Sequence, residues 1–133
     1  MKCIKARVTR GFLVGSRIET CDNSGAKIVK IISVKNYKSV KGRPPSAGVG
    51  DLVFVSVVKG KPDIRKQVVP AVIVRQKRPY RRRNGMRVCF EDNSIVVLKD
   101  EQGNPKGTIF KGPIAKEAAE RWPGIAKLSK VIV

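Results

Sequence analysis

Short runs of valine and isoleucine, separated by glycine, proline and asparagine, are the feature that most restricts how this chain can fold. Such runs are typical of strands that close into a small barrel or pack as a sandwich. We expect strands at residues 17–20, 26–34, 51–59, 68–76, 86–90 and 94–99. Within the third, both faces of residues 52–58 are apolar apart from Ser56, so this strand should be central and covered on both sides. The predicted fold class is mainly β.

Asn84 and Gly85 lie between two expected strands and form the strongest hairpin signal in the chain. Both tolerate the positive φ angles of a type I′ turn. Three arginines precede this turn, and an extended segment 75–83 would reach roughly 26 Å at about 3.3 Å per residue. We therefore expect a two-stranded basic arm. Residues 36–50 indicate a long basic loop or an irregular hairpin.

One helix has clear signals, near the end of the chain. Gly112 and Pro113 precede residues 114–121, and proline at the first helical position loses no donor that the helix needs. Pro123 should end this helix, and residues 125–130 could form a second short one. We expect one domain over residues 1–133, with the barrel in 1–110 and a helical part in 111–133.

The net charge of +19 over 133 residues is self-repelling and indicates a polyanionic partner. Apolar residues make up 41% of the chain, so it can still bury a core and the charge is no sign of disorder. A membrane partner would need a basic amphipathic helix or an apolar span of about 20 residues, and neither is visible. Nucleic acid is the predicted partner, with no membrane.

The first residues offer no apolar stretch long enough for a signal peptide. Cys3, Cys21 and Cys89 are an odd number at wide spacings, which suits a reducing compartment. We expect a cytoplasmic protein whose three cysteines are small buried residues.

The sequence lacks the groups that catalysis commonly uses. It contains no histidine, and no glycine-rich loop matches a cofactor motif. Glu91-Asp92 and Asp100-Glu101 are adjacent acids that would point to opposite faces of a strand, so we interpret them as loop residues. We predict no enzyme activity, no cofactor and no metal site.

Basic residues are concentrated between residues 64 and 90, a segment without any acid. A solvated charged face is the usual explanation of a charge run, but these cations have no acid nearby to offset their repulsion. Guanidinium forks also suit bidentate phosphate contact. Together with two flanking basic segments, the predicted RNA-binding residues are Lys35, Lys38, Lys41, Arg43, Lys59, Lys61, Arg65, Lys66, Arg75, Lys77, Arg78, Tyr80, Arg81, Arg82, Arg83 and Arg87.

Only 5% of the residues are aromatic, whereas proteins that hold single strands stack bases on several exposed rings. Tyr80 is the one candidate for stacking, and Phe54, Phe90 and Phe110 are assigned to the core. We expect contacts mainly with the phosphate and ribose of folded RNA. The alternatives are a free RNA chaperone, which would need exposed aromatic residues on one sheet face, and an RNA-processing enzyme, which would need a base, a metal site or a cofactor loop.

Several positions at fixed offsets resemble the signature of the large-subunit ribosomal protein fourteen family: Ala71-Val72-Ile73-Val74, Asn84-Gly85, Phe90, Asn93 and Val96-Val97. Residues 21–26 resemble the family's amino-terminal motif, and residues 106–108 and 112–115 its carboxy-terminal one. The basic loop before Gly50 and residues 75–79 are similar to the archaeal and eukaryotic branch.

The resemblance implies a five-stranded β-barrel with a protruding basic hairpin and a small helical carboxy-terminal part. It also implies a structural role in the large ribosomal subunit, at the subunit interface. The implied partners are large-subunit rRNA, neighbouring large-subunit ribosomal proteins and, through an inter-subunit bridge, small-subunit rRNA.

Family members also dock anti-association factors through the carboxy-terminal part. On this sequence the implied protein contacts are Lys116, Glu117, Glu120 and Arg121, of which Glu117 and Arg121 form a favourable i, i+4 pair. The alternative is that this helix simply packs on the barrel through Ile114, Ala118, Ala119 and Trp122.

Overall fold

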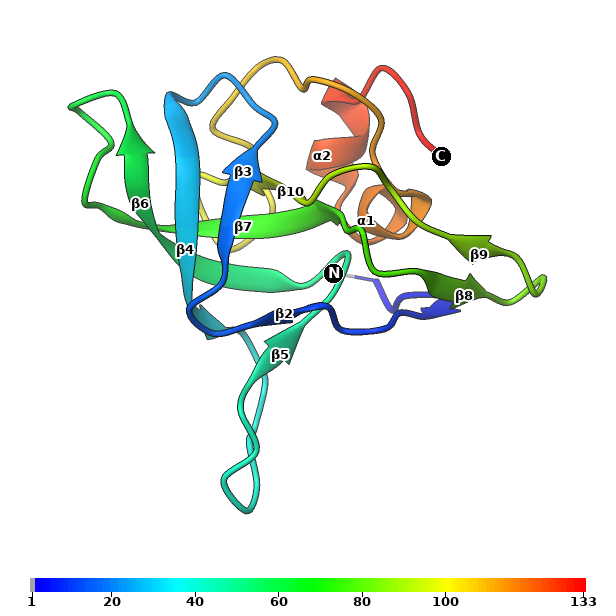
Figure 1. The fold of residues 1–133 in the computed structure, drawn as a ribbon. Helices are drawn as coiled ribbons and strands as arrows, with labels where there is room; N and C mark the ends of the chain where they lie inside the picture. Colours follow the sequence, from blue (N-terminus) through cyan, green and yellow to red (C-terminus); the bar gives the residue numbers. More distant parts are fainter. Residues whose placement is uncertain (1) are drawn as a thin grey trace.

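The computed structural model describes residues 2–133, and its centre is a closed five-stranded barrel (Figure 1). The strands follow the order β10, β3, β4, β6, β7 around the barrel. Neighbours are antiparallel except β3 and β10, which pair in parallel and close the barrel. The bounds of these strands are β3 (Arg17–Thr20), β4 (Ala26–Val34), β6 (Leu52–Gly60), β7 (Val68–Arg75) and β10 (Ser94–Val97). The predicted mainly β fold is confirmed.

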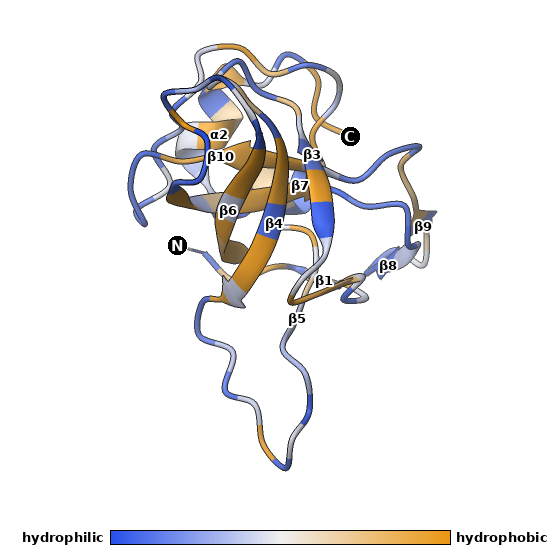
Figure 2. Ribbon diagram, turned by 60° about the vertical axis from the view of Figure 1, so that its left-hand side comes forward, coloured by the Kyte–Doolittle hydropathy of each residue, from blue (hydrophilic) through white to orange (hydrophobic). Residues whose placement is uncertain are grey.

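Alternation along the strands places apolar side chains inside the barrel. In β4, Val29 and Ile31 are buried while Lys30 between them is exposed. In β6 the outward-facing Phe54 and Ser56 are half-buried, so the second face of this strand is only partly covered. Figure 2 shows the resulting apolar colouring of the barrel strands, which contrasts with the polar segments that surround them.

The parallel seam between β3 and β10 is fastened by the residues that follow β3. The buried carboxylate of Asp22 accepts hydrogen bonds from the Val97 amide at 3.0 Å and from the Ser24 hydroxyl at 2.9 Å. The side-chain oxygen of Asn23 accepts a hydrogen bond from the Thr108 amide at 2.8 Å. Residues 21–26 therefore tie the first barrel strand to two distant parts of the chain.

Two small sheets extend from the barrel. One joins β2 (Phe12–Leu13) to β5 (Ser46–Ala47), at the foot of the long loop that projects from the barrel in Figure 1. The other, here called the hairpin sheet, has the order β1 (Ala6–Arg7), β8 (Tyr80–Arg82), β9 (Arg87–Val88). The predicted arm is therefore present but shorter than expected, because residues 75 and 76 are buried in the body.

The turn of this hairpin differs from the predicted type I′. Gly85 has a φ of 86°, but Asn84 is not among the residues with positive φ. The Arg82 amide donates to the Met86 carbonyl at 2.9 Å, and the Gly85 amide donates to the Arg82 carbonyl at 3.0 Å. This is the pattern of a three-residue loop, in which only the glycine needs the left-handed conformation.

The two carboxy-terminal helices are α1 (Lys116–Arg121) and α2 (Pro123–Leu128). The first begins later than predicted because Ile114 pairs with the tail instead: its amide donates to the Val131 carbonyl and its carbonyl accepts from the Val133 amide, each at 2.9 Å. Pro123 opens α2 as well as ending α1. Within the part of the chain that the structure describes, no helix is long and apolar enough to cross a membrane.

Burial corrects the expectation for two of the three cysteines. Cys21 is buried beneath the seam, and this burial raises the pKa of its thiol to about 12. Cys3 and Cys89 are exposed. Of the phenylalanines assigned to the core, Phe110 is buried, whereas Phe54 and Phe90 are half-buried.

Candidate nucleic-acid interface

Most of the predicted RNA-binding side chains are exposed, and they project from three separate segments. The long loop carries Lys38, Lys41 and Arg43; the end of β6 and the β6–β7 connection carry Lys59, Lys61, Arg65 and Lys66; the hairpin region carries Lys77, Arg78, Arg81, Arg83 and Arg87. In Figure 1 the three segments leave the barrel on different sides. The structure therefore does not gather them into one patch but surrounds the barrel with cations.

Arg75 is a correction to the predicted interface, because the residue is only 6% exposed and every guanidinium donor is used within the protein. It forms a two-point ion pair with Asp92 at 2.8 and 2.9 Å and donates to Ser94 at 2.7 Å. Its remaining nitrogen donates to the carbonyls of Lys111 and Pro113. Arg75 thus holds β7, β10 and the approach to α1 together.

Tyr80 and Arg82 are also structural, since both side chains converge on the buried carboxylate of Glu117. The Tyr80 hydroxyl donates to Glu117 at 2.6 Å, and Arg82 donates to the other oxygen at 2.7 Å. Arg82 also donates to the Val133 carbonyl at 2.7 Å. Burial raises the pKa of Tyr80, so its hydroxyl stays protonated and can donate to Glu117. Because only 1% of Tyr80 is exposed, its ring cannot stack on RNA bases. This cluster joins the hairpin sheet to α1 and the tail.

The electrostatics of Glu117 decide its role as well. Burial alone would raise the pKa of its carboxyl, but hydrogen bonds from Arg82 and Tyr80 outweigh burial and hold this pKa below its usual value. Glu117 is therefore a buried anion that orients the hairpin sheet, and not the exposed protein contact that we expected. The i, i+4 ion pair of α1 joins Lys116 and Glu120 at 3.8 Å instead of Glu117 and Arg121.

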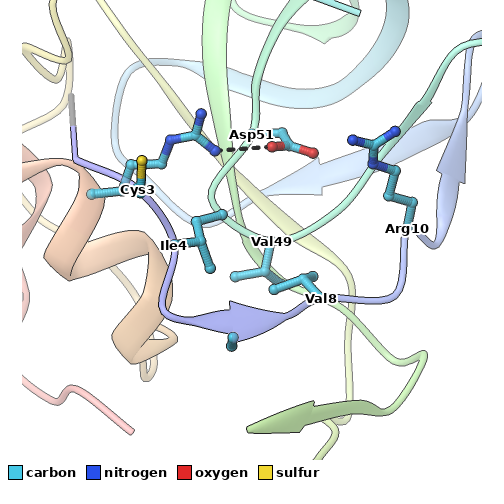
Figure 3. Close-up of a pocket in the computed structure, with 8 residues that line it drawn as sticks. Cys3, Ile4, Val8, Arg10, Val49 and Asp51 are labelled. Carbon is cyan, nitrogen blue, oxygen red and sulfur yellow. Dashed lines mark hydrogen bonds and ion pairs between the residues drawn. The ribbon is translucent and has the colours of Figure 1, made fainter. Parts of the chain in front are cut away.

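Arg121 is half-buried against the barrel, where its guanidinium pairs with Asp51 at 3.0 Å. This ion pair forms one wall of a pocket of about 330 Å³ under the amino-terminal segment. Figure 3 shows the apolar side chains of Ile4, Val8 and Val49 together in this pocket, below Asp51. The pocket is thus where the amino-terminal segment docks on the barrel, and Arg121 contributes to its structure.

The packing alternative for the helical part is confirmed. Ile114, Ala118, Ala119 and Trp122 are all buried, and the indole nitrogen of Trp122 donates to the Gly50 carbonyl at 2.9 Å. Lys116 and Glu120 remain exposed on the outer side of α1. Only these two of the four predicted protein contacts are available to a partner in this structure.

One further predicted RNA-binding residue is already paired in the structure, and several exposed basic residues were not predicted. Lys35 forms an ion pair with Glu101, so its charge is already matched in the free protein. Lys27 and Lys111 were not predicted, yet they line a hollow of about 580 Å³ together with Lys61. Arg7 was also missed, although the alternation of basic and apolar residues at the start of the chain is the signal of a strand with one charged face.

No group of histidine, cysteine or acidic residues within residues 2–133 has the arrangement of a metal site. The ordered positive charge around the barrel suits contacts with phosphate groups.

Comparison with known proteins identifies the family. Residues 11–133 match the family model described as ribosomal protein L14p/L23e. The chain belongs to the ribosomal protein L14p/L23e family. This L14p/L23e chain is 55% identical, over 100% of both chains, to the large ribosomal subunit protein uL14 of Nanoarchaeum equitans. It is 53% identical, over 99% of both chains, to the protein of the same name from Methanococcus vannielii.

Membership confirms the resemblance recognised from the sequence, including the archaeal branch. An L14p/L23e protein is a structural constituent of the ribosome, so the expectation of a non-enzymatic protein is confirmed by the family. The match of the family model begins at residue 11, whereas the archaeal relatives are similar over the whole chain. Strand β1 therefore lies outside the part of this L14p/L23e chain that the family model covers.

Proposed function

We propose that this protein is a scaffold of the large ribosomal subunit, in which its exposed cations neutralise the phosphates of converging segments of large-subunit rRNA. The observation that carries this proposal is the net charge of +19 together with the exposed cations that three segments display around a closed barrel. Neutralised phosphates can approach one another, so a cationic barrel allows RNA segments to pack closely. The protein would reside in the large ribosomal subunit, in the cytoplasm.

The aromatic residues favour this function over that of a free single-strand-binding chaperone. Base stacking needs exposed rings. Within the described residues, none of the seven phenylalanine, tyrosine and tryptophan side chains is exposed, and Tyr80 is 1% exposed. The proposed contacts are therefore with phosphate and ribose, and they read the shape of folded RNA.

Protein partners and the subunit interface are a finer part of the proposal. The exposed Lys116 and Glu120 on α1, and the exposed apolar side chains of Val131, Ile132 and Val133, support contact with neighbouring large-subunit proteins or with an anti-association factor. A bridge to small-subunit rRNA would use the cationic segments that large-subunit rRNA leaves free. Crosslinking of residues 116 and 120 in isolated and joined subunits tests these assignments.

Removal of hairpin cations tests the RNA-binding role. The variant Arg81→Ala, Arg83→Ala, Arg87→Ala should keep its circular dichroism spectrum, because these side chains are exposed. Its incorporation into large subunits, measured by sucrose-gradient sedimentation at increasing salt, should weaken. Loss of three phosphate contacts would reduce the slope of log K against log salt by about 2 to 3.

Lys106→Ala, Lys127→Ala, Lys130→Ala is the matched control, because it removes the same charge from exposed positions outside the three segments. An equal loss in this control would mean that binding follows total charge and not the assigned segments. A wild-type chain that fails to sediment with large subunits would refute the proposed function itself.

A further inference from the structure

Strand β1 adds a third strand to the hairpin, and its register brings three arginines into one line. Arg7 on β1 lies opposite Arg81 on β8, and Arg81 lies opposite Arg87 on β9. We call these three residues the arginine row. All three are exposed, and none takes part in an ion pair among residues 2–133.

The arginine row lies on the outer face of the hairpin sheet. Successive side chains of a strand point to opposite faces. Tyr80 and Arg82, the neighbours of Arg81 in β8, both bind Glu117 of α1. One face of the sheet is therefore fixed against the body of the protein, and the row is held on the face that points away. Figure 2 shows the hairpin sheet set apart from the barrel strands.

The row concentrates like charges at short range. Arg82 and Met86 form a hydrogen-bonded pair, so the preceding pair, Arg81 and Arg87, is of the non-hydrogen-bonded kind, with Cα atoms about 4.5 Å apart. Neighbouring strands are about 4.8 Å apart, so the whole row spans roughly 10 Å. Like charges directly opposite destabilise a sheet. A bound polyanion would relieve this repulsion.

We propose that the arginine row binds successive phosphates of one RNA strand that runs across the three β-strands. This deepens the proposed function and rests on it. The planar fork of each guanidinium can hold a phosphate at two points. Beside the row, Arg7 and the arginines at 81–83 line a hollow of about 480 Å³ with Ile4 and Ala6, which leaves room for the backbone to approach.

Arg7 distinguishes this site from a hairpin that carries arginines on β8 and β9 alone. It lies outside residues 11–133, the part that the family model matches, whereas the archaeal relatives are similar over the whole chain. The amino-terminal strand therefore adds one phosphate contact to a hairpin that would otherwise offer two. An acidic protein segment is the other polyanion that fits three guanidiniums, and RNA is favoured because the chain belongs to a ribosomal protein family.

Single variants measure the contribution of Arg7. The full-length chain is bound to large-subunit particles depleted of this protein, over a series of KCl concentrations. Arg7→Ala and Arg81→Ala should each reduce the slope of log K against log KCl by roughly 0.7 to 0.9. Arg7→Ala should also raise the melting temperature of the free protein, because it removes a like-charge neighbour. Arg7→Lys should keep the slope and bind with intermediate affinity.

Arg17→Ala is the control, because Arg17 is an exposed strand residue that lies opposite another cation, Lys30. It should raise the melting temperature similarly but leave the slope unchanged. A photo-crosslinker placed in turn at positions 7, 81 and 87 should label the same short run of nucleotides.

Any of three results would contradict the proposal for the arginine row. The first is an unchanged slope of log K against log KCl in Arg7→Ala while Arg81→Ala loses affinity. The second is an equal reduction of this slope in Arg17→Ala, and the third is crosslinking of position 7 to protein. If Arg81→Ala and the hairpin triple variant both bind normally, the hairpin takes no part in RNA binding and the row fails with it. If the wild-type chain itself does not bind the depleted particles, the proposed function fails, not only the row.

Discussion

The hairpin sheet and the long loop at residues 36–45 both carry cations away from the barrel, but they hold them differently. The hairpin sheet has three paired strands and is tied to α1 through the buried Glu117. The loop has three long backbone hydrogen bonds of 3.4 Å, donated by Tyr37 and Arg43 and accepted by Pro45, and positive φ angles at Asn36 and Lys41. The hairpin therefore presents its arginines from a fixed backbone, whereas the backbone of the loop must lose conformational entropy when it binds. We infer that the hairpin sets orientation and the loop adds affinity.

Replacing the anchor of the hairpin tests this contrast with the largest expected effect. Glu117→Ala leaves the Arg82 guanidinium and the Tyr80 hydroxyl without their partner, and removal of one member of a buried ion pair costs about 3 kcal/mol or more. Urea unfolding measures this loss. Glu120→Ala is the control on the same helix, and its exposed pair with Lys116 should cost no more than about 0.5 kcal/mol. Equal costs would mean that Glu117 does not anchor the sheet.

Acid should weaken the same anchor. Burial alone would raise the pKa of Glu117 and of Asp92. Hydrogen bonds from Arg82 and Tyr80 instead hold the pKa of Glu117 below its usual 4.5. Hydrogen bonds from Arg75 and Ser94 likewise hold the pKa of Asp92 below its usual 3.8. A carboxyl whose pKa is lower in the folded state contributes stability above its ordinary pKa, and this contribution is lost as pH falls through the lowered value.

Stability measured by urea unfolding should therefore decline below about pH 4.5, and it should decline less in Glu117→Gln. Asp22 opposes this trend, because burial raises its pKa and its protonation favours the folded state. A Glu117→Gln profile that runs parallel to the wild type would show that Glu117 has no part in acid unfolding.

Removing the tip of the loop should have the smallest effect on stability. Replacement of residues 38–43 by two glycines should change the free energy of unfolding by no more than about 0.5 kcal/mol, because this segment is exposed throughout. The same variant loses Lys38, Lys41 and Arg43, so its binding to large-subunit particles should become less dependent on salt. A loss of stability above about 1 kcal/mol would mean that the loop, like the hairpin, is fixed before binding.

Hydropathy and turn signals were sufficient to predict the barrel strands, because each barrel strand is a local pattern of buried side chains. They also located the hairpin and the helical end. The start of α1 was predicted too early because Ile114 pairs with the tail at Val131 and Val133, a contact between distant residues that no local pattern records.

The candidate site was only partly predictable, since charge in the sequence does not reveal its partner. Arg75 finds Asp92 only when β7 and β10 come together, and Arg82 finds Glu117 only when α1 docks. Alternation within β8 could have placed Tyr80 and Arg82 on one face and Arg81 on the other. Arg7 was missed because its strand has only two residues and exists through its pairing with β8.

The parallel seam between β3 and β10 also affects how the protein can be made. Its two members, Arg17–Thr20 and Ser94–Val97, lie at nearly opposite ends of the barrel sequence. A nascent chain that has not yet released β10 has unpaired edges on both β3 and β7, and such edges are prone to join other chains. The barrel can therefore close only late in synthesis. Premature termination before Ser94 would leave an open, aggregation-prone sheet in a fragment that carries most of the chain's positive charge.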